Sequence, residues 1–353
     1  MKLYPVFLIL LLFGFPLLAE DANQSRQRDV PLTLSVLGPV SSNCGKYEQT
    51  NSYFCLGLIN CSLANSYVLT LALSGYNITD YDMEGYSLAL LGNFAGRDTQ
   101  GFQFSFLANT TRRRMYGLQI SFVNVVLEES VIGAQIGAFN INFGETIGAQ
   151  MGFFNSTQES VTGLQIGLVN TVQNSEESGP DFAVQFGLIN YSANPRVLPI
   201  GFINIVHGGR LQLELNRSVL GIPRIDFIMG SPYLYSIFTL DSYTISSRDK
   251  KESANTAAAM EGVGLGAAIP IGPVYSLRLE RRQYFPTKSR PDLARVERWL
   301  LERKVSRAFA LSVGLEKNLF LNSAVDRSRW VQSKANQIRS LTTGVSWNLL
   351  SGL

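Results

Sequence analysis

The sequence has little of what catalytic and metal sites require. Its 353 residues contain a single histidine, His207, which excludes His-cluster metal sites and argues against a His-based catalytic triad. Charged residues make up 16% of the chain, against roughly 25% in an ordinary soluble domain. The net charge of +3 gives no basis for nucleic acid as a partner. We therefore expect no enzyme, no cofactor, no metal site and no nucleic-acid partner.

Long apolar runs are also scarce, and the one that is present lies at the start of the chain. It extends from Leu3 to Leu18 and ends in the small-residue sequence Leu17-Leu18-Ala19. This pattern predicts a cleaved signal peptide over 1–19, with an uncleaved anchor as the alternative. No later stretch has the roughly 18 consecutive apolar residues of a membrane helix. After cleavage, any crossing of a membrane would therefore be made by strands.

Cysteine is rare, and the three that are present allow at most one internal disulfide. Cys55 and Cys61 flank a predicted strand, and at about 3.3 Å per extended residue they lie too far apart to bridge. Any bridge would therefore join Cys44 to Cys61 or to Cys55. The alternative is that all three are small apolar residues without a bridge.

A repeat of the form Gly-x-Gln-x-Gly-x-x-Asn dominates the first half of the chain. Copies that start at residues 101, 117, 133, 148 and 163 lie 15 or 16 residues apart. Each copy alternates with a period of two, which is typical of a β-strand. In 162–170, for example, Leu164, Ile166 and Leu168 share one face, while Gln165 and its flanking glycines occupy the other. The copies are Tyr53–Asn60, Gly101–Asn109, Gly117–Asn124, Gly133–Asn140, Gly148–Asn155, Gly163–Asn170, Ala183–Asn190 and Val197–Asn204.

Two architectures fit this repeat. In a membrane β-barrel the apolar face meets lipid, and the face of glycine and glutamine lines the lumen. In a β-solenoid the apolar face fills a narrow core, and asparagines stack between coils. The alternative to a lumen-lining role is that neighbouring glutamines hydrogen-bond one another. The candidate lumen-lining glutamines are Gln119, Gln135, Gln150, Gln165 and Gln185.

Beyond residue 207 the repeat fades, but the alternation continues. In the run from Tyr275 to Arg282, the residues Tyr275, Leu277 and Leu279 share one face. Arg278, Glu280 and Arg282 share the other and are further candidates for lining a lumen. Small or polar residues on one face and apolar residues on the other are typical of a barrel strand, although a soluble sandwich shows the same alternation.

The rest of the C-terminal half supports the same interpretation. We interpret 290–305 as a strand that pairs with 307–316, with an amphipathic helix as the alternative. The polar inserts Ser246–Asn255 and Ser323–Gln337 predict long loops. From Thr244 onward the chain has 18 Lys and Arg against 9 Asp and Glu. This excess indicates either solvated loops and lumen charges or a surface that attracts anionic headgroups or solutes.

The repeats resemble those of a known protein family. Tandem copies of the Gly-Leu-Gln-Ile-Gly-Leu-Val-Asn type end in Leu198-Pro-Ile-Gly-Phe-Ile-Asn-Ile-Val-His-Gly-Gly209. The strand 211–215 and Met229-Gly-Ser-Pro-Tyr-Leu-Tyr235 follow. Over roughly residues 50–240 the chain resembles the surface-repeat outer-membrane proteins of spirochaetes and other double-membraned bacteria. The resemblance implies an exported protein of the outer membrane or cell surface, and it implies no activity and no catalytic residues.

Together these features predict an all-β fold. We expect an antiparallel transmembrane β-barrel of roughly 14 to 18 strands, built from strand-turn repeats. Residues 20–52 would form an N-terminal segment, 53–206 the repeat strands, and 207–353 the C-terminal strands and loops. The alternative is a β-solenoid with a C-terminal β domain.

The expected role is structural, pore-like or surface-displaying, with a surface-exposed solenoid adhesin or binding module as the alternative. Outer-membrane lipid is the expected partner. Small polar or anionic solutes and host or surface ligands are further candidates.

Overall fold

The computed structural model describes residues 27–37, 40–41, 49–59, 71–79, 81–174, 182–218, 223–243, 258–285, 293–320 and 337–349. These residues form strands and turns, and none of their segments is a helix that could cross a membrane. The chain divides into two compact units, Met1–Ile147 and Gly148–Leu353, which we describe separately. The predicted signal peptide, Cys44, Cys61 and the two predicted long loops Ser246–Asn255 and Ser323–Gln337 fall largely or wholly outside the described residues.

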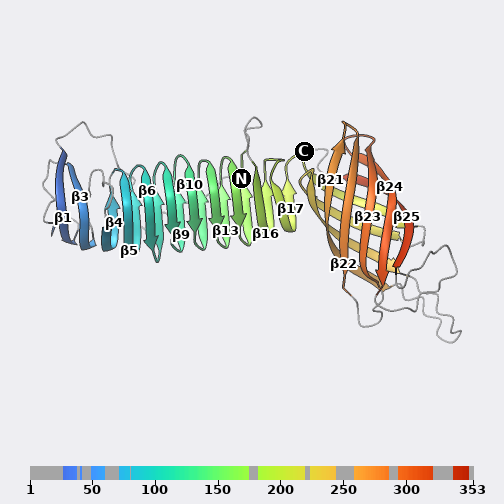
Figure 1. Cartoon of the computed structure of the whole chain (residues 1–353), viewed down its shortest axis with the longest axis horizontal. Helices are drawn as coiled ribbons and strands as arrows, with labels where there is room; N and C mark the ends of the chain where they lie inside the picture. Colours follow the sequence, from blue (N-terminus) through green and yellow to red (C-terminus); the bar gives the residue numbers. More distant parts are fainter. Residues whose placement is uncertain are drawn as a thin grey trace. The chain divides into compact units, whose positions relative to one another are not determined.

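The repeats form a parallel β-solenoid, which was the alternative architecture, and their strands belong to a 17-stranded sheet. Two short strands make one coil, and each strand pairs in parallel with its equivalent in the next coil (Figure 1). The bounds in the first unit are β1 Gln27–Leu37, β2 Val40–Ser41, β3 Gln49–Ile59, β4 Leu71–Thr79, β5 Met83–Ala95, β6 Thr99–Ser105, β7 Ala108–Thr111, β8 Met115–Ile120, β9 Val123–Val126, β10 Val131–Ile136 and β11 Phe139–Asn142, and β12 covers Thr146–Met151.

The second unit contains further coils and then a closed antiparallel barrel of eight strands, β18 to β25 (Figure 1). The parallel strands end at Val206, and the antiparallel strands begin at Arg210. The coil strands are β13 Phe154–Thr157, β14 Val161–Ile166, β15 Val169–Val172, β16 Ala183–Ser192 and β17 Leu198–Val206. The barrel strands are β18 Arg210–Ser218, β19 Pro223–Gly230, β20 Leu234–Tyr243, β21 Ala258–Ile271, β22 Tyr275–Tyr284, β23 Leu293–Lys304, β24 Phe309–Phe320 and β25 Gln337–Asn348.

The all-β class and the antiparallel barrel are thus confirmed, and two details differ from the prediction. The barrel has eight strands rather than 14 to 18, because the repeat strands do not enter it. The segment 290–305 contains β23, which pairs with β24, so its interpretation as a strand is confirmed. Period-two alternation is common to coil strands and barrel strands, and it carries no information about which strand pairs with which.

The coils bury the polar face of the repeat strands and expose the apolar face, which is the reverse of the solenoid that we expected. Asn124 and Gln119 are fully buried, whereas apolar Ile136 and Phe122 stand on the outside. The prediction that the apolar face fills the core is therefore wrong. The interior is narrow, and each buried amide is paired with the same residue one coil along, so its desolvation is compensated.

The repeat glycine has a geometric role in this stacking. Gly117 has a φ of +128°, a conformation that L side chains rarely adopt. A Cβ at this position would lie 2.0 Å from the carbonyl oxygen of Gly101 in the previous coil. Successive coils can therefore approach to hydrogen-bonding distance only if this position has no side chain.

Candidate functional site: the barrel interior and its wall

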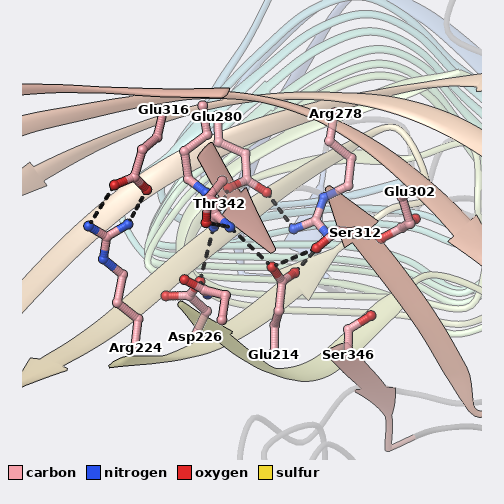
Figure 2. A network of polar contacts seen from close by, with 12 residues as sticks. Glu214, Arg224, Asp226, Arg278, Glu280, Glu302, Ser312, Glu316, Thr342 and Ser346 are labelled. Carbon is pink, nitrogen blue, oxygen red and sulfur yellow. Dashed lines mark hydrogen bonds and ion pairs between the residues drawn. The ribbon is translucent and has the colours of Figure 1, made fainter. Parts of the chain in front are cut away.

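Alternation along the barrel strands brings a set of charged side chains into the lumen. In β22, Arg278, Glu280 and Arg282 point inward and are buried, as the alternation predicted, while Tyr275 and Leu279 face outward. The neighbouring strands contribute further inward charges along the lumen. Figure 2 shows Glu214 and Asp226 pointing toward Arg278 and Glu280 from the facing strands. The set comprises Arg210, Glu214, Arg224, Asp226, Arg278, Glu280, Arg282, Arg298, Glu302 and Glu316.

Arg278 lies at the centre of this network. Its Nη1 lies 2.7 Å from Glu214 Oε2 and 2.8 Å from Glu302 Oε2. Its Nη2 contacts Glu280, and its Nε donates to the hydroxyl of Tyr235 at 3.1 Å. All three nitrogens of this guanidinium therefore have partners inside the barrel.

Arg282 and Arg298 extend the network toward the next strands. Arg282 Nη1 lies 2.8 Å from Asp226 Oδ1, and its Nη2 lies 2.7 Å from Glu280 Oε2. Arg298 bridges the same two carboxylates at 3.3 and 3.2 Å. Beside them, Arg224 pairs with Glu316 through both of its terminal nitrogens. The carboxylates are thus shared between arginines from different strands, which cross-links the wall.

The interior is balanced in charge and filled by side chains. Its five arginines face five carboxylates, and none of these side chains is appreciably exposed. An eight-stranded barrel encloses an interior just wide enough for side chains to fill. The arrangement therefore acts as a set of structural cross-links, because each charge is neutralised by an opposite charge at contact distance.

The glycines of β21 provide the space for these side chains. A Cβ on Gly266 would lie 2.1 Å from Cε2 of Tyr235, and a Cβ on Gly264 would lie 2.9 Å from Cγ of Arg282. The inner face of β21 thus leaves room for large residues that project from β20 and β22. This explains why glycine alternates with Val263 and Leu265 along the strand.

The outer wall of the barrel has the opposite polarity. Three successive rows across β22 to β25 differ in character. The first row is charged and consists of Arg281, Glu297, Lys317 and Arg339, which are direct neighbours in register. The next row is apolar and consists of Leu279, Trp299, Leu315 and Leu341. The third row consists of Leu277, Leu301, Val313 and Thr343.

Aromatic residues mark the other end of this apolar band. Phe309 and Trp347 stack with ring centroids 6.0 Å apart, and Tyr275 lies near the same end under the guanidinium of Arg303. The outward residues Phe309, Leu311, Val313 and Leu315 form an apolar stretch of roughly 20 Å along β24, which ends before Lys317. An apolar band bounded by aromatic residues is a feature of the outer wall of outer-membrane barrels.

A cavity of about 990 Å³ opens at this aromatic end of the barrel. Its lining includes His207, Arg210, Lys304, Arg307 and Asn348. His207 lies in the turn between β17 and β18, and its backbone amide donates to the carbonyl of Ser192. The cavity carries several basic side chains, and one of them, Arg210, also pairs with Glu302 of the ion network.

The glutamines predicted to line a lumen lie instead inside the solenoid coils. Gln119 Nε2 donates to Gln103 Oε1 at 2.8 Å, and Gln135 donates to Gln119 at 2.9 Å. In the second unit, Gln165 donates to Gln150 at 2.7 Å, and Gln185 donates to Gln165 at 2.8 Å. These glutamines form the mutual hydrogen bonds that were the alternative to a lumen-lining role.

Several residues of the site were not identified from the sequence. Glu214, Asp226, Arg298 and Glu302 belong to the network, yet none was a candidate. The alternation of 211–215 could have revealed Glu214. Arg298 and Glu302 were obscured because 290–305 also fits an amphipathic helix.

The disulfide prediction stays open. Cys55 is buried in β3, while Cys44 and Cys61 lie outside the described residues. Among the described residues, no group of three or more His, Cys, Asp and Glu side chains is arranged to hold a metal ion.

Comparison with known proteins gives one structural likeness. No family model and no curated protein matches the chain. One solved structure, from work on the de novo design of transmembrane β-barrels, is similar to it at 13% identity and a TM-score of 0.26. The match covers 39% of this chain and 92% of the designed chain.

Proposed function

We propose that the protein is an outer-membrane protein whose eight-stranded barrel is a closed anchor in the lipid. The observation that carries this proposal is the inverted polarity of the barrel. Fully buried ion pairs fill the interior, while Trp299, Leu315 and Leu341 are 44 to 56% exposed on the outer wall. In water such a wall would be a large exposed apolar surface, whereas in a bilayer it is the lipid-facing band.

The connections between strands support the same proposal. At the aromatic end, β19 and β20 are joined by 231–233, β21 and β22 by 272–274, and β23 and β24 by 305–308. At the opposite end the connections include the longer segments 244–257 and 321–336. Short turns at one end and longer loops at the other are typical of outer-membrane barrels, in which the short turns face the periplasm.

Of the structural, pore-like and surface-displaying roles, the interior favours a structural role. A channel needs a continuous aqueous path, and here Arg278, Arg282 and Arg298 cross the lumen to carboxylates on other strands. Export and the outer-membrane location remain predictions, and they agree with this role.

The gel mobility of boiled and unboiled protein tests directly whether the barrel is a closed anchor in the membrane. The protein would be purified from the membrane fraction in detergent and run with and without boiling, after carbonate extraction of the membranes. We expect a boil-dependent shift and resistance to carbonate, because a closed barrel stays folded in detergent. A Val313→Arg variant places a charge in the apolar band and should reduce membrane assembly, whereas Ser306→Arg in the adjoining turn should not. Extraction of the wild-type protein into buffer with no gel shift would refute the proposal.

A further inference from the structure

The solenoid coils of the second unit have one apolar edge and one polar edge. The apolar edge is formed by the third residue after each repeat glutamine, or after Pro199 at the equivalent position of the last coil, and comprises Phe153, Leu168, Leu188 and Phe202. These side chains are 53 to 64% exposed. The polar edge is the opposite turn of the coil, for example Gln158-Glu159-Ser160.

The first unit has the same two edges at the equivalent positions. Phe106 and Phe122 are 61 and 54% exposed. On the polar edge, Arg112 pairs with Glu128 at 2.7 Å, and Arg113 pairs with Glu129 at 3.0 Å. The hydrogen bond to Glu129 raises the pKa of Arg113 above its ordinary value. The charged residues of these coils are thus confined to one edge.

Coil stacking does not require the apolar edge. The interior is held by the ladders of buried asparagine and glutamine, in which Asn155 donates to Asn170 and Asn170 donates to Asn190, each at 2.8 Å. Polar residues at the positions of Leu168 and Leu188 would leave these ladders intact. A row of large apolar side chains that is exposed and unnecessary for the fold indicates a contact surface.

The last coil connects this edge to the wall of the barrel. Phe202 packs edge-to-face on Phe238 of β20, with ring centroids 4.5 Å apart. Asn204 Nδ2 donates to Ser236 Oγ at 2.7 Å, and Ser236 Oγ donates to the carbonyl of Gly201 at 2.7 Å. Ser236 and Phe238 face outward from the barrel, on the surface that the proposed function places in lipid. The contact lies close to the short turn 231–233, at the aromatic end of the barrel.

We infer that the apolar edge of the solenoid is itself in contact with lipid. Phe153, Leu168, Leu188 and Phe202 would enter the acyl region of the leaflet at the short-turn end, while the polar edge stays in water or among headgroups. This is the geometry of an interfacial amphipathic element, here made of stacked coils rather than a helix. The inference rests on the proposed function, because the edge is continuous with the wall of the barrel. That continuity favours lipid over a second copy of the chain as the occupant.

Quenching of tryptophan fluorescence by lipids brominated in their acyl chains tests this inference. The full chain would be reconstituted into phosphatidylcholine vesicles with Trp299, Trp330 and Trp347 replaced by Phe, and single tryptophans would then be placed individually. Leu168→Trp reports on the apolar edge, Glu159→Trp on the polar edge of the same coil, and retained Trp299 on the barrel wall. Leu188→Trp repeats the first measurement one coil further on, in case Leu168→Trp does not assemble.

We expect brominated lipid to quench Leu168→Trp and Trp299 to a similar extent and to leave Glu159→Trp nearly unchanged. If Trp299 is quenched and neither Leu168→Trp nor Leu188→Trp is, the inference is wrong and the barrel proposal stands. That result would also be obtained if a second copy of the chain covered the edge. If Trp299 is not quenched, the barrel proposal itself fails. Equal quenching of Leu168→Trp and Glu159→Trp would also overturn the inference, because the two edges would then not differ.

Discussion

At the scale of single residues, the barrel depends on exact pairing between its inward side chains. A large residue on one strand is accommodated by a glycine on the next, and each buried charge has a partner from another strand. Such an interior tolerates few changes, since a buried charge without a partner is far more costly than a pair. The outward residues beside the same positions provide matched controls.

The ion network predicts that Arg278→Met strongly lowers the free energy of unfolding of the barrel. The change leaves Glu214 and Glu302 without their closest partner, and breaking a buried pair in this way costs about 3–5 kcal/mol. We expect a loss of this size in the free energy of unfolding, measured by urea titration in detergent micelles with gel mobility as the readout. Arg281→Met, on the outer face of the same strand, should have a much smaller effect. Equal effects of the two changes would contradict the inward placement of Arg278.

Because the ring of Tyr235 fills the space beside Gly266 on the inner face of β21, we expect Gly266→Val to disrupt the barrel. Its side chain would collide with the ring of Tyr235, which is fully buried and whose hydroxyl is hydrogen-bonded to Glu280 and Arg278. We expect a lower fraction of the heat-modifiable form after refolding. Ala267→Val, which faces outward on the same strand, should refold like the wild type. If Gly266→Val refolds normally, then the ring of Tyr235 does not occupy the inner face of β21.

At the scale of elements, the solenoid is held by ladders of hydrogen-bonded amides together with small buried apolar clusters, such as that of Val161, Val172, Ala183 and Val197. Asn170→Ala removes the hydrogen bonds of Asn170 to Asn155, Asn190 and the carbonyl of Phe186. Buried groups left without partners cost about 1–3 kcal/mol each. We expect faster hydrogen exchange in β13 to β16, measured by mass spectrometry. Val169→Ala, at the half-buried neighbouring position, serves as the control. Unchanged hydrogen exchange in both variants would show that the hydrogen bonds between buried asparagines do not hold the coils together.

The sequence predicted the strands better than it predicted their partners. Alternation along 275–282 correctly separated inward from outward residues, because a barrel strand has one face toward each environment. The repeat strands alternate in the same way, yet Gln119 pairs with a residue one coil away rather than across a hairpin. Only the 15- or 16-residue spacing of the repeats bears on which strands pair, and this spacing is compatible with both a barrel and a solenoid. The ion network needs residues from β18, β19, β22, β23 and β24 together, which no local pattern reveals.

At the scale of the whole molecule, each unit buries a network of polar side chains and carries exposed large apolar side chains on its outside. The lengths of the barrel connections then predict its orientation. We expect an epitope tag inserted at Ser328, in the connection 321–336, to be accessible on intact cells. A tag inserted at Gly272, in the short turn after β21, should react only after the outer membrane is permeabilised, because short turns face the periplasm. The opposite pattern would show that the barrel is inverted.

The conductance of planar bilayers that contain the purified wild-type protein tests most directly whether the barrel is closed. The proposed anchor crosses the membrane with an interior closed by ion pairs between Arg278, Arg282, Arg298 and their carboxylates. This arrangement predicts a protein that inserts, as shown by recovery of the heat-modifiable form from the bilayer lipid, and yet gives no stable conductance steps. Regular, long-lived steps from the inserted wild-type protein would contradict it, because they require a continuous aqueous path through the lumen.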